Sequence, residues 1–146
     1  MMDRQEIEEF LKEAPVGRLG TVYEQQPYIV PLNFLYQEGK IYFHGKSGKK
    51  ITNLKSNNKV CFEIDEFKEI ISADTACQFT VRARSVITIG KTRLIEEPKE
   101  KLRILEKFME KYSPGDQKFF NESQIRSVIV GEIQIETMEG KKKHWD

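Results

Sequence analysis

The sequence of 146 residues has little cysteine and histidine and no long apolar run. Its two cysteines, Cys61 and Cys77, lack a CxxC partner, which excludes a disulfide-rich scaffold and favours free thiols in a reducing compartment. Without a long apolar segment the chain offers neither a membrane span nor a signal peptide, so we expect a cytoplasmic protein. His44 and His144 stand apart from both cysteines, so no zinc-ligand spacing is present and no metal site is expected.

The sequence also has no large excess of positive or negative charge. The 24 Lys and Arg residues against 23 Asp and Glu residues leave a formal net charge of +1. Such a chain has no strong field to attract nucleic acid or an anionic membrane, so we expect neither partner and any basic site must be local. No linker or internal repeat divides the sequence, and residues 1–146 are predicted to form a single globular domain.

Two amphipathic helices are predicted from caps and apolar spacing. The first begins with a capping box formed by Asp3 and Glu6 and ends before Pro15. The second starts at Pro98, a favoured first-turn residue, and extends to Tyr112. Each has an apolar face, namely Ile7, Phe10, Leu11 and Ala14 in the first helix and Leu102, Leu105, Phe108 and Met109 in the second.

Strands are predicted over residues 16–22, 28–36, 40–44, 59–65, 78–95 and 127–138. Pro31 cannot donate a ladder hydrogen bond, so its strand should lie at an edge or contain a bulge. Glu38 and Gly39 form a hairpin turn, and Gly90 should bend residues 78–95 into one kinked strand or two strands. Residues 66–75 are expected to be a connection. Strands that follow one another through hairpins favour an antiparallel α+β domain of about six or seven strands and three helices, closed or partly closed as a barrel.

The strongest functional signal lies at residues 28–54. An apolar strand and a second strand ending in His44 are followed at once by a basic turn at Gly48, Lys49 and Lys50. Ser47 is the predicted N-cap of a short helix over residues 48–56. A phosphate at this helix start would meet backbone N–H groups, the positive end of the helix dipole and two ammonium groups. Because lysine is otherwise disfavoured in a first turn, we interpret the pair as an anion site.

The order of these motifs resembles the FMN-binding split-barrel family, the pyridoxamine 5′-phosphate oxidase-like flavoproteins, and within it the 5-nitroimidazole resistance branch. The matching residues are 16–21, 27–34, 39–44, 48–54, 60–63, 79–90 and 96–98. The resemblance implies an antiparallel split β-barrel with flanking helices and FMN as cofactor. It also implies a homodimer whose flavin sites lie at the subunit interface.

The same resemblance implies a set of cofactor-binding residues: Val30, Pro31, Leu32, Asn33, His44, Lys49, Lys50 and Ser85. The backbone of residues 30–33 is expected to follow the isoalloxazine ring, the histidine and both lysines to contact the phosphate side, and the serine to contact the flavin from a neighbouring strand. The true oxidase has arginine where this chain has Lys49, so phosphate would be held by a point charge and not by a planar fork. No counterpart of the oxidase's C-terminal substrate-binding residues is present, and pyridoxamine phosphate oxidation itself is not expected.

The primary hypothesis is an FMN-dependent oxidoreductase that transfers electrons from a reduced donor to a small organic acceptor such as a nitro compound. Because the flavin would supply the redox chemistry, no side chain is named as catalytic. The alternative is a non-catalytic protein that binds or stores FMN or haem on the same barrel. A third hypothesis, a nucleic-acid-binding barrel, conflicts with the near-neutral charge.

Two basic groups remain open in the sequence. The run Lys141–Lys143, next to His144 and Trp145, is interpreted as a solvated tail, with contact to nucleic acid or to a partner's flavin as the alternative. Arg82 and Arg84 alternate along a predicted strand. They either contribute to the pocket or pair with acidic residues at positions 63 and 65 of the neighbouring strand.

Overall fold

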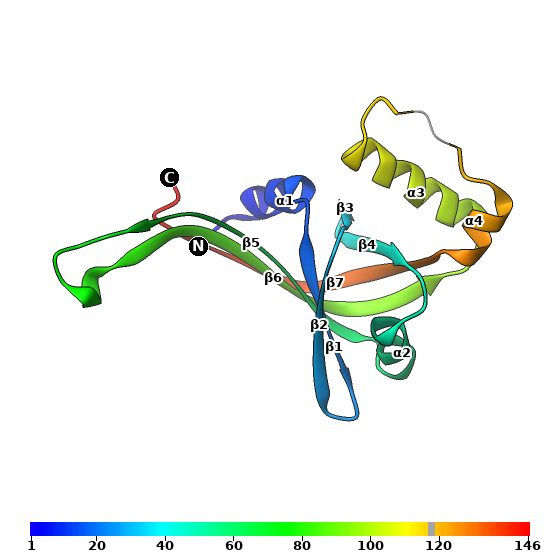
Figure 1. Cartoon of the computed structure of the whole chain (residues 1–146), viewed down its shortest axis with the longest axis horizontal. Helices are drawn as coiled ribbons and strands as arrows, with labels where there is room; N and C mark the ends of the chain where they lie inside the picture. The colour runs from blue at the N-terminus through cyan, green and yellow to red at the C-terminus, as the bar shows by residue number, and fades with distance from the viewer. Residues whose placement is uncertain (117–118) are drawn as a thin grey trace.

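The computed structural model describes residues 1–116 and 119–146 of the chain (Figure 1). The described residues form one seven-stranded antiparallel sheet in the order β2-β1-β5-β6-β7-β4-β3. Its strands are β1 (Gly17–Tyr23), β2 (Gln26–Leu32), β3 (Leu35–Gln37), β4 (Lys40–Gly45), β5 (Lys59–Ile71), β6 (Thr80–Ile95) and β7 (Ile129–Lys143). The helices are α1 (Arg4–Glu13), α2 (Lys49–Ser56), α3 (Pro98–Tyr112) and α4 (Glu122–Ser127), with a 3-10 turn η1 (Ala76–Gln78). The predicted α+β split-barrel class is confirmed, and the sheet stays open, with β2 and β3 at its edges.

Helices α1 and α3 begin at their predicted caps. In α1 the Asp3 carboxylate accepts the backbone N–H of Glu6, and the Glu6 carboxylate accepts the N–H of Asp3, both at 2.9 Å. Helix α3 starts at Pro98 as expected. The sequence prediction missed α4, which is six residues long and has a single buried side chain, Ile125. One buried residue in so short a segment produces no periodicity, so the expected number of three helices was too low.

Strands β5 and β7 extend beyond their predicted C-terminal ends. Residues 66–75 were expected to be a connection, but β5 continues to Ile71 and forms with β6 an arm that projects from the sheet (Figure 1). A register shift between Phe67 and Glu69 interrupts the alternation, which is why the pattern was lost there. β6 is one strand with an irregularity at Gly90, where a Cβ atom would lie 2.3 Å from the carbonyl oxygen of Gln134. The alternative of one strand is therefore confirmed, and the irregularity lies at Gly90 as expected, although the extra residue, Glu136, belongs to β7.

The predicted strand over residues 28–36 is two strands. β2 ends at Leu32, and β3 begins at Leu35 after a break at Asn33–Phe34. β2 is an edge strand, which confirms the expectation drawn from Pro31. The hairpin turn before β4 is also confirmed, because Glu38 and Gly39 have φ angles of 49° and 79°.

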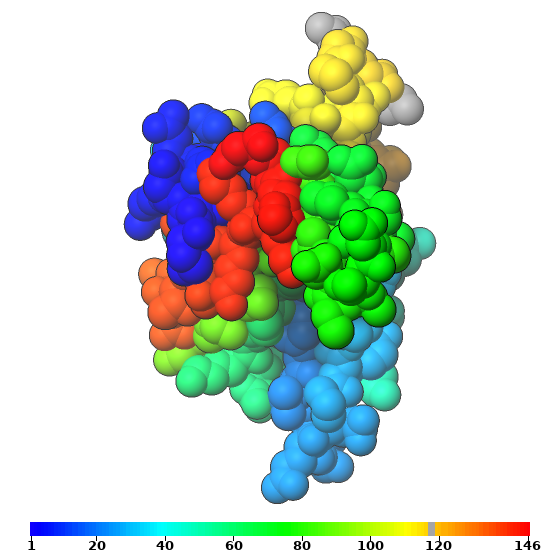
Figure 2. Space-filling model, turned by 90° about the vertical axis from the view of Figure 1, so that its left-hand side faces the viewer, coloured from blue at the N-terminus to red at the C-terminus, as the bar shows by residue number. Residues whose placement is uncertain are grey.

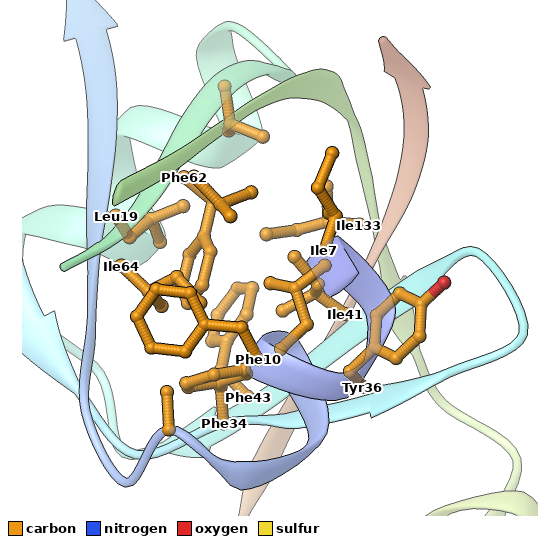
Figure 3. Close-up of a cluster of buried hydrophobic side chains, with 14 of the residues drawn as sticks. Ile7, Phe10, Leu19, Phe34, Tyr36, Ile41, Phe43, Phe62, Ile64 and Ile133 are labelled. Atoms are coloured by element: carbon orange, nitrogen blue, oxygen red, sulfur yellow. The ribbon is translucent and has the colours of Figure 1, made fainter. Parts of the chain in front are cut away.

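The main core lies between the curved sheet and α1 (Figure 3). Phe34 and Phe62 meet edge to face with ring centroids 4.9 Å apart. Gly17 leaves room for this pair, since a Cβ atom there would lie 2.1 Å from the Phe62 ring. A second core lies under α3 and consists of Tyr42, Ile95, Ile104, Leu105, Phe108 and Val130.

The C-terminal segment is not a solvated tail. Lys141–Lys143 belong to β7, and the last residues lie between α1 and the β5–β6 arm (Figure 2). The Arg84 guanidinium lies 3.9 Å from the Phe10 ring and 4.5 Å from the Trp145 ring. Lys68 covers the same tryptophan at 3.8 Å, so the terminal aromatic residue is fixed by two cations. Within the described ranges no helix has the length and apolar character required to cross a bilayer.

Candidate functional site

Helix α2 begins with an N-terminus that no side chain of the described residues caps. The prediction that Ser47 is the N-cap is wrong, because the helix starts one residue later and Gly48 occupies the cap position. Glycine has no side-chain oxygen, so the first-turn N–H groups of Lys49 and Lys50 receive no side-chain acceptor. The helix therefore presents free donors and two ammonium groups at the same end.

A buried amide fixes α2 against the sheet. Asn53 is 1% exposed, and its Nδ2 donates to the Thr21 hydroxyl of β1 at 3.0 Å. Ile51 and Leu54 are buried on the same side of the helix. These contacts determine which way the basic first turn points.

The two lysines of this turn reach to different strands. The Lys49 ammonium lies 5.0 Å from the centroid of the Tyr28 ring on β2. Lys50 folds back over Gly45 at the end of β4, where a Cβ atom would lie 3.0 Å from its Nζ. Neither lysine forms an ion pair with a carboxylate among the residues that the structure describes. The basic turn thus bridges the edge strand β2 and the end of β4 with its positive charge unpaired.

His44 lies beside this turn at the mouth of a cavity. Its ring meets Phe108 of α3 edge to face, with centroids 4.7 Å apart. Burial, and then the nearby Lys50 ammonium, lower the pKa of His44, so the imidazole is neutral at pH 7. A cavity of about 530 Å³ continues from it along α3 and α4 and is lined by His44, Gly45, Lys46, Leu105, Phe120, Gln124, Ser127 and Val128.

The predicted flavin-contacting strand occupies the edge of the sheet. Val30 and Leu32 are partly buried against the core, whereas Pro31 and Asn33 are exposed. Among the described strands β2 pairs with β1 alone, so the backbone groups on its other edge have no strand partner there. Residues 30–33 therefore combine partial burial on one face with an open backbone edge.

Ser85 does not join this cluster within one chain. It lies on the outward face of the sheet, opposite Asp65 of β5 and Lys141 of β7. The structure thus brings together Lys49, Lys50 and His44 and places the serine elsewhere.

Arg18 also lies on the outward face of the sheet, and the sequence analysis did not identify it as a candidate. Its guanidinium pairs with Glu63 at 3.3 Å and with Asp65 at 2.6 Å. Burial and then Asp65 raise the pKa of Glu63. The two arginines left open above pair elsewhere, Arg82 with Glu69 and Arg84 with Glu66.

The outward face of the sheet also has an apolar row. Cross-strand pairing aligns Ile29, Gly20, Cys61 and Ile89 on neighbouring strands, so their side chains share one face. Ile29 is 64% exposed and Ile89 39% exposed, and Ile87 next to them is 47% exposed. Large apolar side chains are thus exposed around the Arg18 cluster.

A family model described as pyridoxamine 5′-phosphate oxidase matches residues 3–142 of this chain. A curated relative from Rhizobium meliloti (strain 1021), itself uncharacterised, is 33% identical over 67 residues, which is 46% of this chain and 44% of that protein. The match thus spans less than half of the curated relative's length.

Solved structures extend the likeness over nearly the whole chain. A protein from Bacteroides thetaiotaomicron VPI-5482, assigned to 5-nitroimidazole antibiotic resistance, is 30% identical, with 96% of this chain and 84% of that chain covered and a TM-score of 0.85. An FAD-binding protein from Mesorhizobium loti is 25% identical, with 95% and 94% covered and a TM-score of 0.68. An FAD and haem binding protein from Mycobacterium smegmatis, 16% identical with 99% and 74% covered and a TM-score of 0.90, shares the fold.

Proposed function

The chain belongs to the pyridoxamine 5′-phosphate oxidase family, and from this premise we propose that it is an FMN-binding oxidoreductase. It would pass reducing equivalents from a reduced donor to a small organic acceptor. The observation that carries the proposal is the uncapped, doubly basic first turn of α2, which lies between the free edge of β2 and His44.

The basic turn fits a terminal phosphate. A phosphate monoester has a charge close to −2 at neutral pH, which two unpaired ammonium groups match. The first-turn N–H groups of α2 and the helix dipole favour the same anion. A diphosphate bridge would place further negative charge beyond Lys49 and Lys50, and for this reason we propose FMN and not FAD.

The free edge of β2 suits the flavin ring. Unpaired backbone groups over Val30–Asn33 offer donors and acceptors to the polar edge of a planar heterocycle. Bound there, FMN would supply two-electron redox chemistry. The residues of this chain would bind it, orient it and exclude water from one side, and none is needed as a nucleophile.

The cavity beyond His44 is the proposed place of the acceptor. Its apolar walls suit a flat organic molecule, and the Lys46 ammonium and an N–H group of the neutral imidazole suit negatively polarised oxygens such as those of a nitro group. The 30% identical protein assigned to nitroimidazole resistance supports a nitro compound as acceptor.

We propose that two chains assemble through the outward face of the sheet. The exposed Ile29, Ile87 and Ile89 surround charged groups that already pair within one chain, so a second copy would cover apolar surface without leaving these charges unpaired. Ser85 lies on this face, and there it would approach the partner's cofactor. Ile89→Glu should convert a dimer into a monomer in light scattering, whereas Glu9→Lys on exposed α1 should not.

Purified protein provides the direct test of function. Visible absorption, with mass measurement of the ligand released on denaturation, should identify FMN, and a nicotinamide donor should bleach its bands. Lys49→Ala with Lys50→Ala should weaken FMN binding by on the order of tenfold or more. The double change Lys55→Ala with Lys59→Ala removes the same charge from exposed positions and should leave affinity unchanged. Equal affinities of the two double variants would contradict the phosphate placement.

The second candidate function is a non-catalytic carrier of FMN or haem. A neutral imidazole at the mouth of the cavity of about 530 Å³ favours it, because His44 would be able to bind haem iron there. A bound chromophore that no physiological donor reduces would support the carrier. A haem spectrum that is lost in His44→Ala would support haem as its ligand.

A further inference from the structure

Three segments that are far apart in the sequence meet at the end of β2. They are residues 14–16 between α1 and β1, the break at Asn33–Phe34, and the last turn of α3. Carbonyl groups in both connections lie outside the sheet ladder and need other partners. Lys111 and Tyr112 of α3 supply them.

Lys111 joins two of these segments with one amino group. Its Nζ donates to the carbonyl oxygens of Ala14 and Phe34, each at 2.8 Å. The same group lies 3.9 Å from the centroid of the Phe34 ring, in cation–π geometry. The lysine thus holds both the backbone and the side chain of Phe34, the second residue after β2.

Tyr112 completes the contact. Its hydroxyl accepts the backbone N–H of Phe34 at 3.0 Å and lies 2.8 Å from the Pro15 carbonyl and 3.0 Å from the Phe34 carbonyl, to either of which it can donate. The Asn33 side-chain amide donates to the same Pro15 carbonyl at 3.1 Å. Both backbone polar groups of Phe34 are therefore held by side chains of α3.

Burying the Lys111 ammonium group costs free energy that an apolar side chain of similar size would not cost. Burial lowers the pKa of Lys111 to about 8, because its ammonium has lost water. Methionine could fill the same space without this desolvation. What the amine adds is a fixed position for two backbone segments.

β2 has few other restraints at this end. Its last pair with β1 is Gly17 with Leu32, and no strand in the described part of the chain lies on its other side. Val30 and Leu32 are only partly buried, whereas Phe34 is fully buried. The position of the strand end therefore depends on how α3 holds Phe34.

We propose that Lys111 and Tyr112 are positioning residues that hold the free edge of β2, over Val30–Asn33, where it meets the flavin ring. This inference rests on the proposed function. The two side chains act through the backbone of Phe34 and do not touch the cofactor.

The test compares Lys111→Met and Tyr112→Phe with Lys99→Met, a control in the exposed first turn of the same helix. FMN affinity and the absorption spectrum of bound FMN are measured, together with amide hydrogen exchange of residues 33–35 in the ligand-free protein. Both variants should bind FMN on the order of tenfold more weakly, shift its visible bands and exchange faster at these amides. The control should match the wild type. Lys111→Arg keeps donors and charge and should recover most of the affinity, which a loss of packing would not explain.

The outcomes separate this inference from the proposed function. If the wild type binds FMN and both variants bind it with unchanged affinity and spectrum, the positioning role is wrong and the flavin proposal stands. If the wild type binds no flavin, the proposed function fails and the positioning role with it, whatever the exchange rates show. Unchanged exchange at Phe34 in folded Tyr112→Phe also overturns the inference.

Discussion

Replacing Lys111 by methionine should change how the stability of the protein depends on pH. In the folded chain burial lowers the pKa of Lys111 to about 8, from an ordinary value of 10.5. Between these values the unfolded chain binds the proton and the folded chain does not, so the free energy of unfolding rises with pH. Methionine removes the titrating group and with it this rise.

The expected size follows from the same two values. From pH 8 to pH 9.5 the wild type should gain at most about 2 kcal/mol over Lys111→Met, at about 1.4 kcal/mol for each pH unit. Below pH 8 both states are protonated, and the difference between the two proteins should stay constant. The groups that face the amine do not reverse this trend. The Ala14 and Phe34 carbonyls do not titrate, and burial raises the pKa of Tyr112.

Urea unfolding followed by circular dichroism at several pH values between 7 and 9.5 provides the assay. The free energy of unfolding of each variant is subtracted from that of the wild type at the same pH, which cancels the titration of all other groups. Lys99→Met is the control, and its difference should stay flat, because an exposed ammonium remains in water in both states. A flat or falling difference for Lys111→Met over pH 8 to 9.5 would refute the assigned desolvation.

Four further substitutions, of which Gly20→Ala is the control for Gly17→Ala, test the fold and its connection to the site. Gly17→Ala would place a Cβ atom 2.1 Å from the Phe62 ring and should lower the free energy of unfolding by about 2 kcal/mol in urea. Gly20→Ala on the same strand, with its nearest neighbour at 3.5 Å, should change it by less than about 0.5 kcal/mol. Asn53→Ala should cost about 2 kcal/mol and weaken FMN binding in a fluorescence titration, because it leaves a buried hydroxyl of β1 unpaired and frees α2. Trp145→Ala should lower stability by about 1 kcal/mol in the same urea assay but leave FMN affinity unchanged, since the stack lies at the opposite end of the sheet from α2 (Figure 1).

Features that depend on neighbouring residues could be predicted from the sequence. The capping box at Asp3 and Glu6, the helix start at Pro98 and the hairpin at Glu38–Gly39 each require only residues within four positions. Pro31 predicted an edge because its ring removes a ladder donor wherever the strand lies. In each case the local chemistry permits one structure whatever the rest of the chain does.

Features that depend on residues far apart in the chain could not be predicted from the sequence. The break between β2 and β3 is fixed by Tyr112, whose hydroxyl holds a residue 78 positions away. Arg18 finds its carboxylates 45 and 47 positions along the chain. The packing of α3 determines the first contact and strand register the second, and neither leaves a mark in a single sequence.

The candidate site likewise has a part that local sequence predicts and a part that depends on distant residues. The basic turn at Lys49 and Lys50 was predicted from local rules and lies at a helix start as expected. Its neighbours Tyr28 and Gly45, and the cavity along α3 and α4, come from the packing of separate segments. The contact of Ser85 with a flavin remains a prediction, which depends on a second chain.

The fold adds a reason for the anion site that the sequence lacks. The arginines along the sheet form ion pairs with carboxylates, as Arg18, Arg82 and Arg84 do. Lys50 instead lies over Gly45, a position where a side chain would contact its ammonium group at 3.0 Å. Valine at this position should therefore displace the ammonium, and FMN binding would then weaken without loss of charge. Because Gly45 has no side chain, the Lys50 ammonium group can lie over it. This ammonium group has no acidic partner among the described residues, which is the arrangement expected where a ligand supplies the negative charge.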